Sequence, residues 1–95
     1  FLQVLGIDSE DNIANFGLGD ISYSRGKFID AINFLETAIK SNPNHSQAYL
    51  MLGKSYEAIF DIERAKKVFL KGVEVASKRG EMMPANEMQS RLNKI

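Results

Sequence analysis

The sequence predicts an all-α fold in which pairs of antiparallel helices stack on one another. The first observation is that residues of the same kind recur 34 positions apart (52 − 18 = 65 − 31 = 34): Leu18-Gly19 and Leu52-Gly53, Ala31 and Ala65, Leu35 and Phe69. Self-similarity at such a spacing is typical of stacked helical repeats. The second is that apolar residues recur at steps of three and four, as on one face of a helix, without the alternation of a strand. The third is that glycine and proline divide the chain into about five segments of helical length.

The first element is an apolar lead-in over residues 1–9, which we expect to pack against the first helix. That helix is predicted over residues 10–24 and contains two glycines, Gly17 and Gly19. Each glycine costs about 1 kcal/mol relative to alanine in a helix. Close approach of another helix is the usual reason for glycine at such positions, so we expect a close neighbour at both.

The second helix is predicted over residues 28–40. It follows a turn at Arg25-Gly26-Lys27, in which Gly26 can adopt a positive φ without steric cost. Its apolar residues fall on one stripe at three- and four-residue steps. The helix ends before Pro43, because the residue preceding a proline is driven out of the helical conformation.

Three further helices are predicted over residues 45–59, 62–78 and 81–94. Phe60-Asp61 forms the turn between the first two of them. Gly80 ends the second, as a residue in the left-handed conformation does. Pro84 is compatible with the last helix because it falls in the first turn, where the missing backbone donor has no partner to lose.

The repeated unit resembles the tetratricopeptide repeat, whose pattern is Trp-x2-Leu-Gly-x2-Tyr, then Ala-x3-Phe, then Pro. The second copy shows Tyr49-x2-Leu52-Gly53-x2-Tyr56 and Ala65-x3-Phe69, and the first retains Leu18-Gly19, Gly26, Ala31, Ala38 and Pro43. As a whole the chain is similar to short bacterial proteins that have two such repeats and a C-terminal capping helix. The resemblance implies one domain folded as a right-handed α-α superhelix: lead-in 1–9, repeats 12–45 and 46–79, and capping helix 80–95.

Four departures from the family pattern affect what we expect locally. Asn15 and Ser22 stand where the family has large aromatic residues, as suits an end repeat with no preceding neighbour to pack against. Phe60 replaces the glycine of the turn, so we expect that connection to bend differently. Ser77 replaces the closing proline, and the fourth helix is expected to run past the usual length. Asn86-Glu87 replaces Leu-Gly in the last helix, which we place in the register of a third repeat, 34 residues after the second.

The composition excludes several classes of protein. Without cysteine there is no disulfide framework, thiolate metal site or cysteine nucleophile. No apolar run approaches the ~20 residues of a membrane span, so membrane insertion is not expected. Twelve basic and twelve acidic residues leave no net charge, so nucleic acid is not an expected partner. The charge is uneven, however: residues 1–36 carry two bases and six acids (2 − 6 = −4), and residues 37–95 carry ten and six (10 − 6 = +4).

No set of residues points to catalysis, a metal or a cofactor. Gly53-Lys54-Ser55 resembles the end of a phosphate-binding loop, but that motif needs a glycine five positions earlier, where Ala48 stands. His45 is the only histidine, which excludes a multi-histidine metal site. No Ser-His-Asp set or convergent carboxylate pair is visible. We therefore predict no enzyme activity, no bound metal and no cofactor.

The resemblance also implies a concave groove lined by the first helix of each pair. Its predicted residues are Ile13, Phe16, Asp20 and Tyr23 in the first repeat, Gln47, Leu50, Lys54 and Glu57 in the second, and Met88 and Arg91 in the capping helix. Four of them would form an apolar strip: Phe16, Tyr23, Leu50 and Met88. An Asp20–Lys54 pair would lie beside this strip. Family members that bind a C-terminal carboxylate carry a Lys/Asn/Arg clamp where Phe16 and Asp20 stand, so that ligand is not expected.

An apolar strip in a groove suits an amphipathic helix or an apolar peptide. The sequence therefore predicts a cytoplasmic adaptor or scaffold that binds such a segment of another protein. Two alternatives stay open: the lead-in 1–7 or the last helix of the chain fills the groove, or the protein self-associates or serves as a structural subunit of a larger assembly. The charge asymmetry and Met82-Met83 favour self-association or a structural role. Because the chain begins at Phe1 rather than Met, the localisation rests on an N-terminus that is expected to be incomplete.

Overall fold

The computed structural model describes residues 12–95, which form helices and no strand. The helices are α2 (Asn12–Ser24), α3 (Phe28–Ser41), α4 (Ser46–Ala58), α5 (Ile62–Lys78) and α6 (Met82–Lys94). The predicted all-α fold is confirmed, and the predicted ends of α3 to α6 agree with the structure to within one residue. The lead-in 1–9 and the expected start of the first helix at Glu10 lie outside the described residues.

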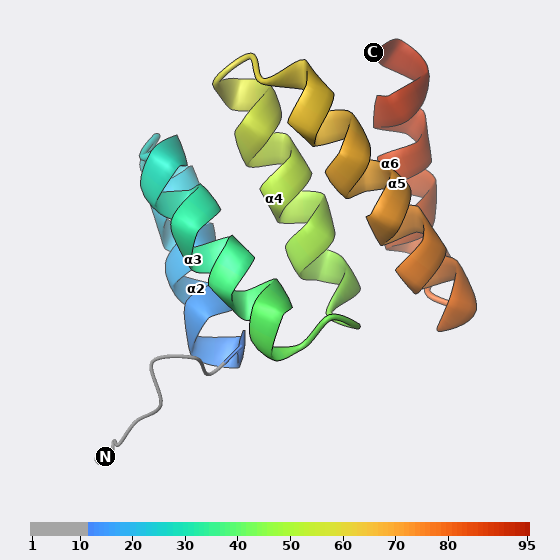
Figure 1. The fold of residues 1–95 in the computed structure, drawn as a ribbon, viewed down its shortest axis with the longest axis horizontal. Coiled ribbons are helices and arrows are strands. Elements are labelled where there is room, and N and C mark those ends of the chain that lie inside the picture. The colour runs from blue at the N-terminus through green and yellow to red at the C-terminus, as the bar shows by residue number, and fades with distance from the viewer. Residues whose placement is uncertain (1–11) are drawn as a thin grey trace.

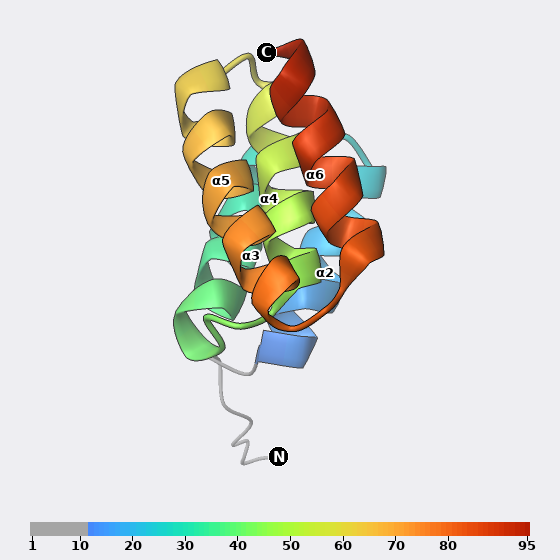
Figure 2. The ribbon, with the colours of Figure 1, turned by 90° about the vertical axis from the view of Figure 1, so that its right-hand side faces the viewer.

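The helices are arranged in two layers (Figures 1 and 2). α2 packs on α3 and α4 on α5 as antiparallel pairs, and the pairs stack through α3 against α4 and α5 against α6. Contacts also join α2 to α4 and α4 to α6, so these three helices form one layer. No backbone contact joins α3 to α5 within residues 12–95, so the second layer contains two separated helices.

Three turns between helices close in the same way. Gly26, Phe60 and Gly80 have φ values of 78°, 64° and 73°. In each turn the backbone N–H of the next residue donates to the carbonyl five positions earlier: Lys27 to Ser22 (2.8 Å), Asp61 to Tyr56 (2.9 Å) and Glu81 to Ala76 (2.8 Å). This is the helix-ending motif that normally contains glycine. The expectation that Phe60 bends its connection differently is therefore wrong, because Phe60 adopts the left-handed conformation of the glycine that it replaces.

Replacing Phe60 by glycine is expected to raise the free energy of unfolding by about 1 kcal/mol. A left-handed conformation costs an L-residue roughly 1–2 kcal/mol, of which the greater entropy of unfolded glycine cancels a part. The ring is 86% exposed, so its removal loses little packing. Urea denaturation of Phe60→Gly checks the gain, and Phe60→Ala, which keeps the strained backbone, should show none. A glycine variant less stable than wild type would contradict the explanation.

The helix pairs are held together by large side chains that pack on glycines. A Cβ atom added at Gly19 would lie 2.6 Å from Leu35 Cγ, and one at Gly53 would lie 2.6 Å from Phe69 Cδ1. Leu35 and Phe69 are both fully buried. The expected close approach is thus confirmed at Gly19. At Gly17 it is wrong, since no described atom would lie within 4 Å of an added Cβ.

In the first repeat, the residues of α2 that are buried are not the ones that the sequence predicted. Asn15 and Ser22, predicted as polar residues of an open end, are buried, with exposed fractions of 7% and 9%. Leu18 and Ile21 are instead 46% and 50% exposed. The reason is geometric: Asn15 and Ser22 lie on the face of α2 that packs into the fold. Within residues 12–95, α2 therefore presents these two apolar side chains at the end of the stack.

The last helix is shifted by two residues from the predicted register. α5 has 17 residues against 14 in α3, and the connection after it is one residue shorter (79–81 against 42–45), so α6 begins 36 residues after α4 (82 − 46). The buried residues Pro84, Ala85 and Met88 accordingly match Ala48, Tyr49 and Leu52 of α4 at this spacing. The prediction that α5 is longer than usual is confirmed. The prediction that Asn86-Glu87 occupies the Leu-Gly position is wrong, because Met88-Gln89 lies there.

Candidate functional site

The ten residues predicted to line the groove lie on α2, α4 and α6, but they differ widely in exposure. Ile13, Asp20 and Gln47 are exposed, Phe16, Tyr23, Lys54, Glu57 and Arg91 are half-buried, and Leu50 and Met88 are buried. In this conformation Met88 offers no surface to a ligand, and Leu50, which is 7% exposed, offers only an edge. An open apolar strip that includes them is therefore not present.

Met88 is buried by the chain itself. Its side chain is fully inaccessible and packs against Gly72 of α5. The two-residue shift of α6 explains this, because Met88 takes the place of the buried Leu52 rather than that of Lys54. The position on α6 equivalent to Ile13 and Gln47 is Met83, which is 85% exposed (13 + 34 = 47 and 47 + 36 = 83). Sequence reasoning did not place Met83 at this position, although the extra length of the fourth helix was a signal for the shift.

The charged residues in the middle of this surface do not pair as expected. Lys54 Nζ lies 5.3 Å from the centre of the Tyr23 ring, and no ion pair joins Lys54 to Asp20 among the described residues. A cation over an aromatic ring at this distance is an attractive interaction between α4 and α2. Asp20 is an exposed carboxylate on α2. The predicted Asp20–Lys54 pair is thus replaced by a contact between Lys54 and Tyr23.

Arg91 and Glu57 connect α6 to α4. The guanidinium Nη1 donates to Glu57 Oε1 at 2.7 Å, and Nε lies 3.6 Å from Glu87 Oε2. The Arg91 and Glu57 side chains are only 33% and 20% exposed, so water screens this pair less than an open surface pair. These two predicted groove residues therefore hold neighbouring helices together at one end of the surface.

The opposite end of the surface is built around His45, which precedes α4. Its ring lies against Phe16 with centroids 4.6 Å apart, joining α2 to α4. Burial lowers the pKa of His45 from its ordinary value; the nearby Glu81 carboxylate opposes this shift and Arg79 adds to it. Ser46 donates a hydrogen bond to the Glu81 carboxylate, which lowers the pKa of Glu81. The neutral imidazole therefore acts here as an aromatic packing surface.

The described residues offer little for chemistry on a substrate. Between residues 12 and 95 no group of three or more His, Cys, Asp or Glu side chains could hold a metal ion. The Nδ1 atom of His45 is buried and has no hydrogen-bond partner among residues 12–95, so within them it contacts no serine or carboxylate that it could activate or be oriented by. None of the helices in this part of the chain is both long and apolar enough to cross a membrane. The surface formed by α2, α4 and α6 instead offers apolar side chains and a few charged groups.

The chain matches a known protein family. Residues 22–82 match the model of the tetratricopeptide repeat. The chain is also similar to a TPR repeat-containing protein of Pseudomonas aeruginosa, with 27% identity over 90 residues that cover 95% of this chain and 84% of that protein. The similarity thus extends over nearly the whole length of both chains.

Solved structures show the same fold. The crystal structure of a tetratricopeptide repeat domain protein from Salinibacter ruber has a TM-score of 0.81 at 24% identity, covering 88% of this chain and 93% of that one. The solution structure of a Bordetella parapertussis protein has a TM-score of 0.83 at 26% identity, covering 98% of this chain and 79% of that one. The two-layered stack of α2 to α6 is therefore a helical-repeat solenoid.

Proposed function

The chain belongs to the tetratricopeptide repeat family, and from this premise we propose that it binds an apolar or helical segment of another protein across α2, α4 and α6. The family and the fold support a protein–protein interaction module in general, and such modules are typically not enzymes. The finer proposal concerns where the segment binds and which side chains it contacts.

The observation that carries the proposal is a row of side chains at equivalent positions on the three helices. Ile13 on α2 and Met83 on α6 are 75% and 85% exposed, and Gln47 on α4 lies at the equivalent position between them. Two exposed apolar side chains on either side of a polar one can contact the apolar face of an amphipathic helix laid across the layer. Methionine suits this role, since its flexible thioether adapts to partners of different shape.

Half-buried aromatic residues extend this surface along α2. Phe16 lies next to the row, against His45, and Tyr23 lies beyond it, under Lys54. Both rings are held by their neighbours, so little side-chain entropy would be lost when a ligand packs on them. Asp20 and Lys54 between them provide one charge of each sign, which can fix the orientation of a bound segment.

Affinity capture with matched variants tests the proposal. Ile13→Glu/Met83→Glu should lose the proteins that wild type captures, because charge is placed at both apolar contacts. Leu70→Glu is the matched control: Leu70 is 61% exposed on α5, in the other layer, so capture should be unchanged. Far-ultraviolet circular dichroism must show that all three proteins are folded. Equal capture by the double variant and by wild type would refute the proposed surface.

Self-association or docking into a larger assembly is the second candidate, and the open end of the stack favours it. Leu18 and Ile21 are half exposed, whereas their equivalents Leu52 and Ser55 on α4 are 3% and 0% exposed. α3 packs on α4, and a helix of a second subunit placed in the same way would cover Leu18 and Ile21. A sedimentation coefficient that rises with concentration would favour this candidate over a monomeric adaptor.

A further inference from the structure

A hollow lies between α3 and α5, on the face of the molecule opposite the α2–α4–α6 surface. These two helices pack on α4 but not on each other, which leaves a cleft of about 280 Å³. The floor is formed by Tyr49 and Leu52 of α4, with Ile39 and Val68 on the walls. Its size is just below that of small-molecule pockets, so it suits one or two inserted side chains rather than a whole ligand.

The floor and walls of this cleft are apolar. Tyr49 and Leu52 are buried at its base, while Ile39 and Val68 are half-buried and in part open to solvent. The Tyr49 hydroxyl is turned away from solvent and donates to the Pro43 carbonyl at 2.8 Å, so the ring presents carbon to the cleft. An apolar side chain placed here would be removed from water, which stabilises binding by roughly 25 cal/mol per Å² buried.

The rim on the α5 side is cationic. Lys67 and Lys71, one helical turn apart, line the cleft and are exposed. α5 as a whole carries five basic and two acidic residues (5 − 2 = +3). Glu74 lies 3.8 Å from Lys71, but both side chains are more than half exposed, so this pair neutralises the lysine only weakly.

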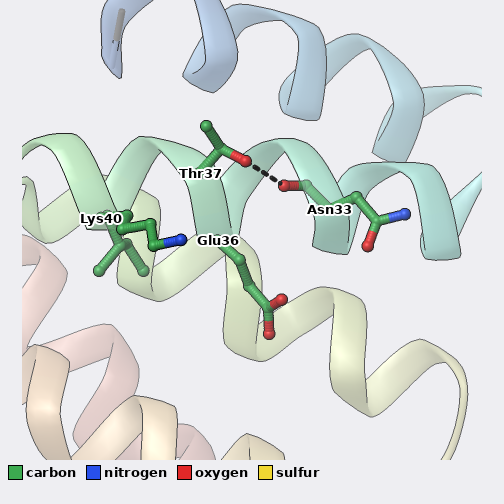
Figure 3. A pocket seen from close by; sticks show the side chains of 5 residues that line it. Asn33, Glu36, Thr37 and Lys40 are labelled. Atoms are coloured by element: carbon green, nitrogen blue, oxygen red, sulfur yellow. Dashed lines mark hydrogen bonds between the residues drawn. The ribbon is translucent and has the colours of Figure 1, made fainter. Parts of the chain in front are cut away.

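The rim on the α3 side carries one acid and one base. Figure 3 shows Glu36 extending from α3 toward α4, and Lys40 one turn further along α3. Glu36 accepts a hydrogen bond from the Tyr56 hydroxyl. Burial and this hydrogen bond raise the pKa of Tyr56 to about 12, so the phenol remains a donor at neutral pH. A second hollow along α3 shares Glu36 and Ile39 with the cleft and ends at Lys40, which extends the cationic rim.

We propose that this cleft binds an acidic peptide segment of a protein partner, with one apolar side chain on the floor and carboxylates beside Lys67 and Lys71. Charge complementarity selects an acidic partner, and the apolar floor selects a peptide over nucleic acid. A nucleic-acid surface would offer exposed aromatic rings for stacking, whereas the ring here, Tyr49, is 5% exposed. The cleft lies on the face opposite the α2–α4–α6 surface, so the two sites can be occupied together.

The test is a chemical-shift titration of the isotope-labelled full chain with a synthetic peptide, Glu-Asp-Glu-Leu-Phe-Glu-Asp-Glu. We expect saturable shifts at Ile39, Lys67 and Val68. A peptide with lysines in place of the acids, and one with alanines in place of Leu-Phe, should each bind at least about tenfold more weakly, a loss of about 1.4 kcal/mol.

Matched variants locate the site. Lys67→Glu/Lys71→Glu should weaken binding of the acidic peptide about tenfold, since each exposed ion pair contributes modestly. Lys66→Glu reverses a charge on the same helix outside the cleft and should leave binding within about twofold. Glu36→Gln removes the one acid of the rim, keeps an acceptor for Tyr56 and should strengthen binding about twofold. The groove variant Ile13→Glu/Met83→Glu should bind the acidic peptide as wild type does, so the two sites can fail independently.

Four outcomes would overturn the proposal. One is the absence of saturable shifts with the acidic peptide, and another is shifts confined to α2, α4 and α6. A third is equal weakening by Lys66→Glu and by the cleft variant, which would indicate a diffuse charge effect. The fourth is displacement of the peptide by a single-stranded oligonucleotide or by a second copy of this chain that binds the cleft more tightly, which would assign it to that occupant.

Discussion

Replacing Phe69 by alanine is expected to lower the free energy of unfolding by about 3–5 kcal/mol. Phe69 is fully buried, and its ring lies on Gly53 between α4 and α5. At the usual 0.05–0.15 kcal/mol per residue, a chain of 95 residues has a total stability of about 5–14 kcal/mol. The variant therefore loses a large part of this stability, and its urea midpoint, followed by far-ultraviolet circular dichroism, should fall by about a fifth or more.

The neighbouring residue supplies the control. Leu70 follows Phe69 on α5 but is 61% exposed, so Leu70→Ala should change stability by no more than about 0.5 kcal/mol. Both variants remove a large apolar side chain from the same helix, and the main difference between them is burial. Similar midpoints for the two would show that the ring of Phe69 does not fill the space between α4 and α5.

The helices could be predicted because their signals are local. The three- and four-residue apolar steps, the glycine at position 26 and the proline at position 43 each act within a few residues of where they stand. The 34-residue repeat then relates distant segments without any knowledge of tertiary contacts. For these reasons the all-α stack and the ends of α3 to α6 followed from the sequence almost unchanged.

The position of α6 could not be predicted in the same way. Its register depends on where α5 ends and how many residues the next turn needs, and both are decided by packing. Arg79 and Gly80 provide the turn, but no local signal at these residues indicates that the spacing between equivalent helices is 36 residues here instead of 34. Met88 was consequently placed in the groove and Met83 was not. A shift of two residues in a helix turns a side chain by roughly 200°, enough to exchange a buried face for an open one.

The candidate surface was only partly predictable for a related reason. Ile13, Asp20 and Gln47 are exposed as a groove position requires, because they follow the repeat register of the two complete repeats. Which groups pair with which depends on side-chain geometry across helices. Lys54 lies over Tyr23 instead of beside Asp20, a choice between two attractive partners that spacing along the chain does not decide.

Gly53 and Gly17 both lie within helices, where glycine is normally unfavourable, and they are expected to respond to alanine with opposite signs. At Gly17 no described atom lies within 4 Å of an added Cβ, so Gly17→Ala should stabilise by about 1 kcal/mol through helix propensity. At Gly53 the same Cβ would lie 2.6 Å from Phe69 Cδ1, on a ring with no free space. The overpacking costs about 1–3 kcal/mol and the propensity gain offsets about 1 kcal/mol of it, so a net loss of up to about 2 kcal/mol is expected.

A double-mutant cycle identifies the ring as the cause of this loss. In the Phe69→Ala background the methyl group of Gly53→Ala enters vacated space, so there the second change should be neutral or stabilising. The coupling free energy between the two positions should exceed about 1 kcal/mol, which is within the range for residues in contact. Urea denaturation of the four proteins measures it. Additive effects, or a stabilising Gly53→Ala in the wild-type background, would mean that α4 and α5 can separate without cost at this point.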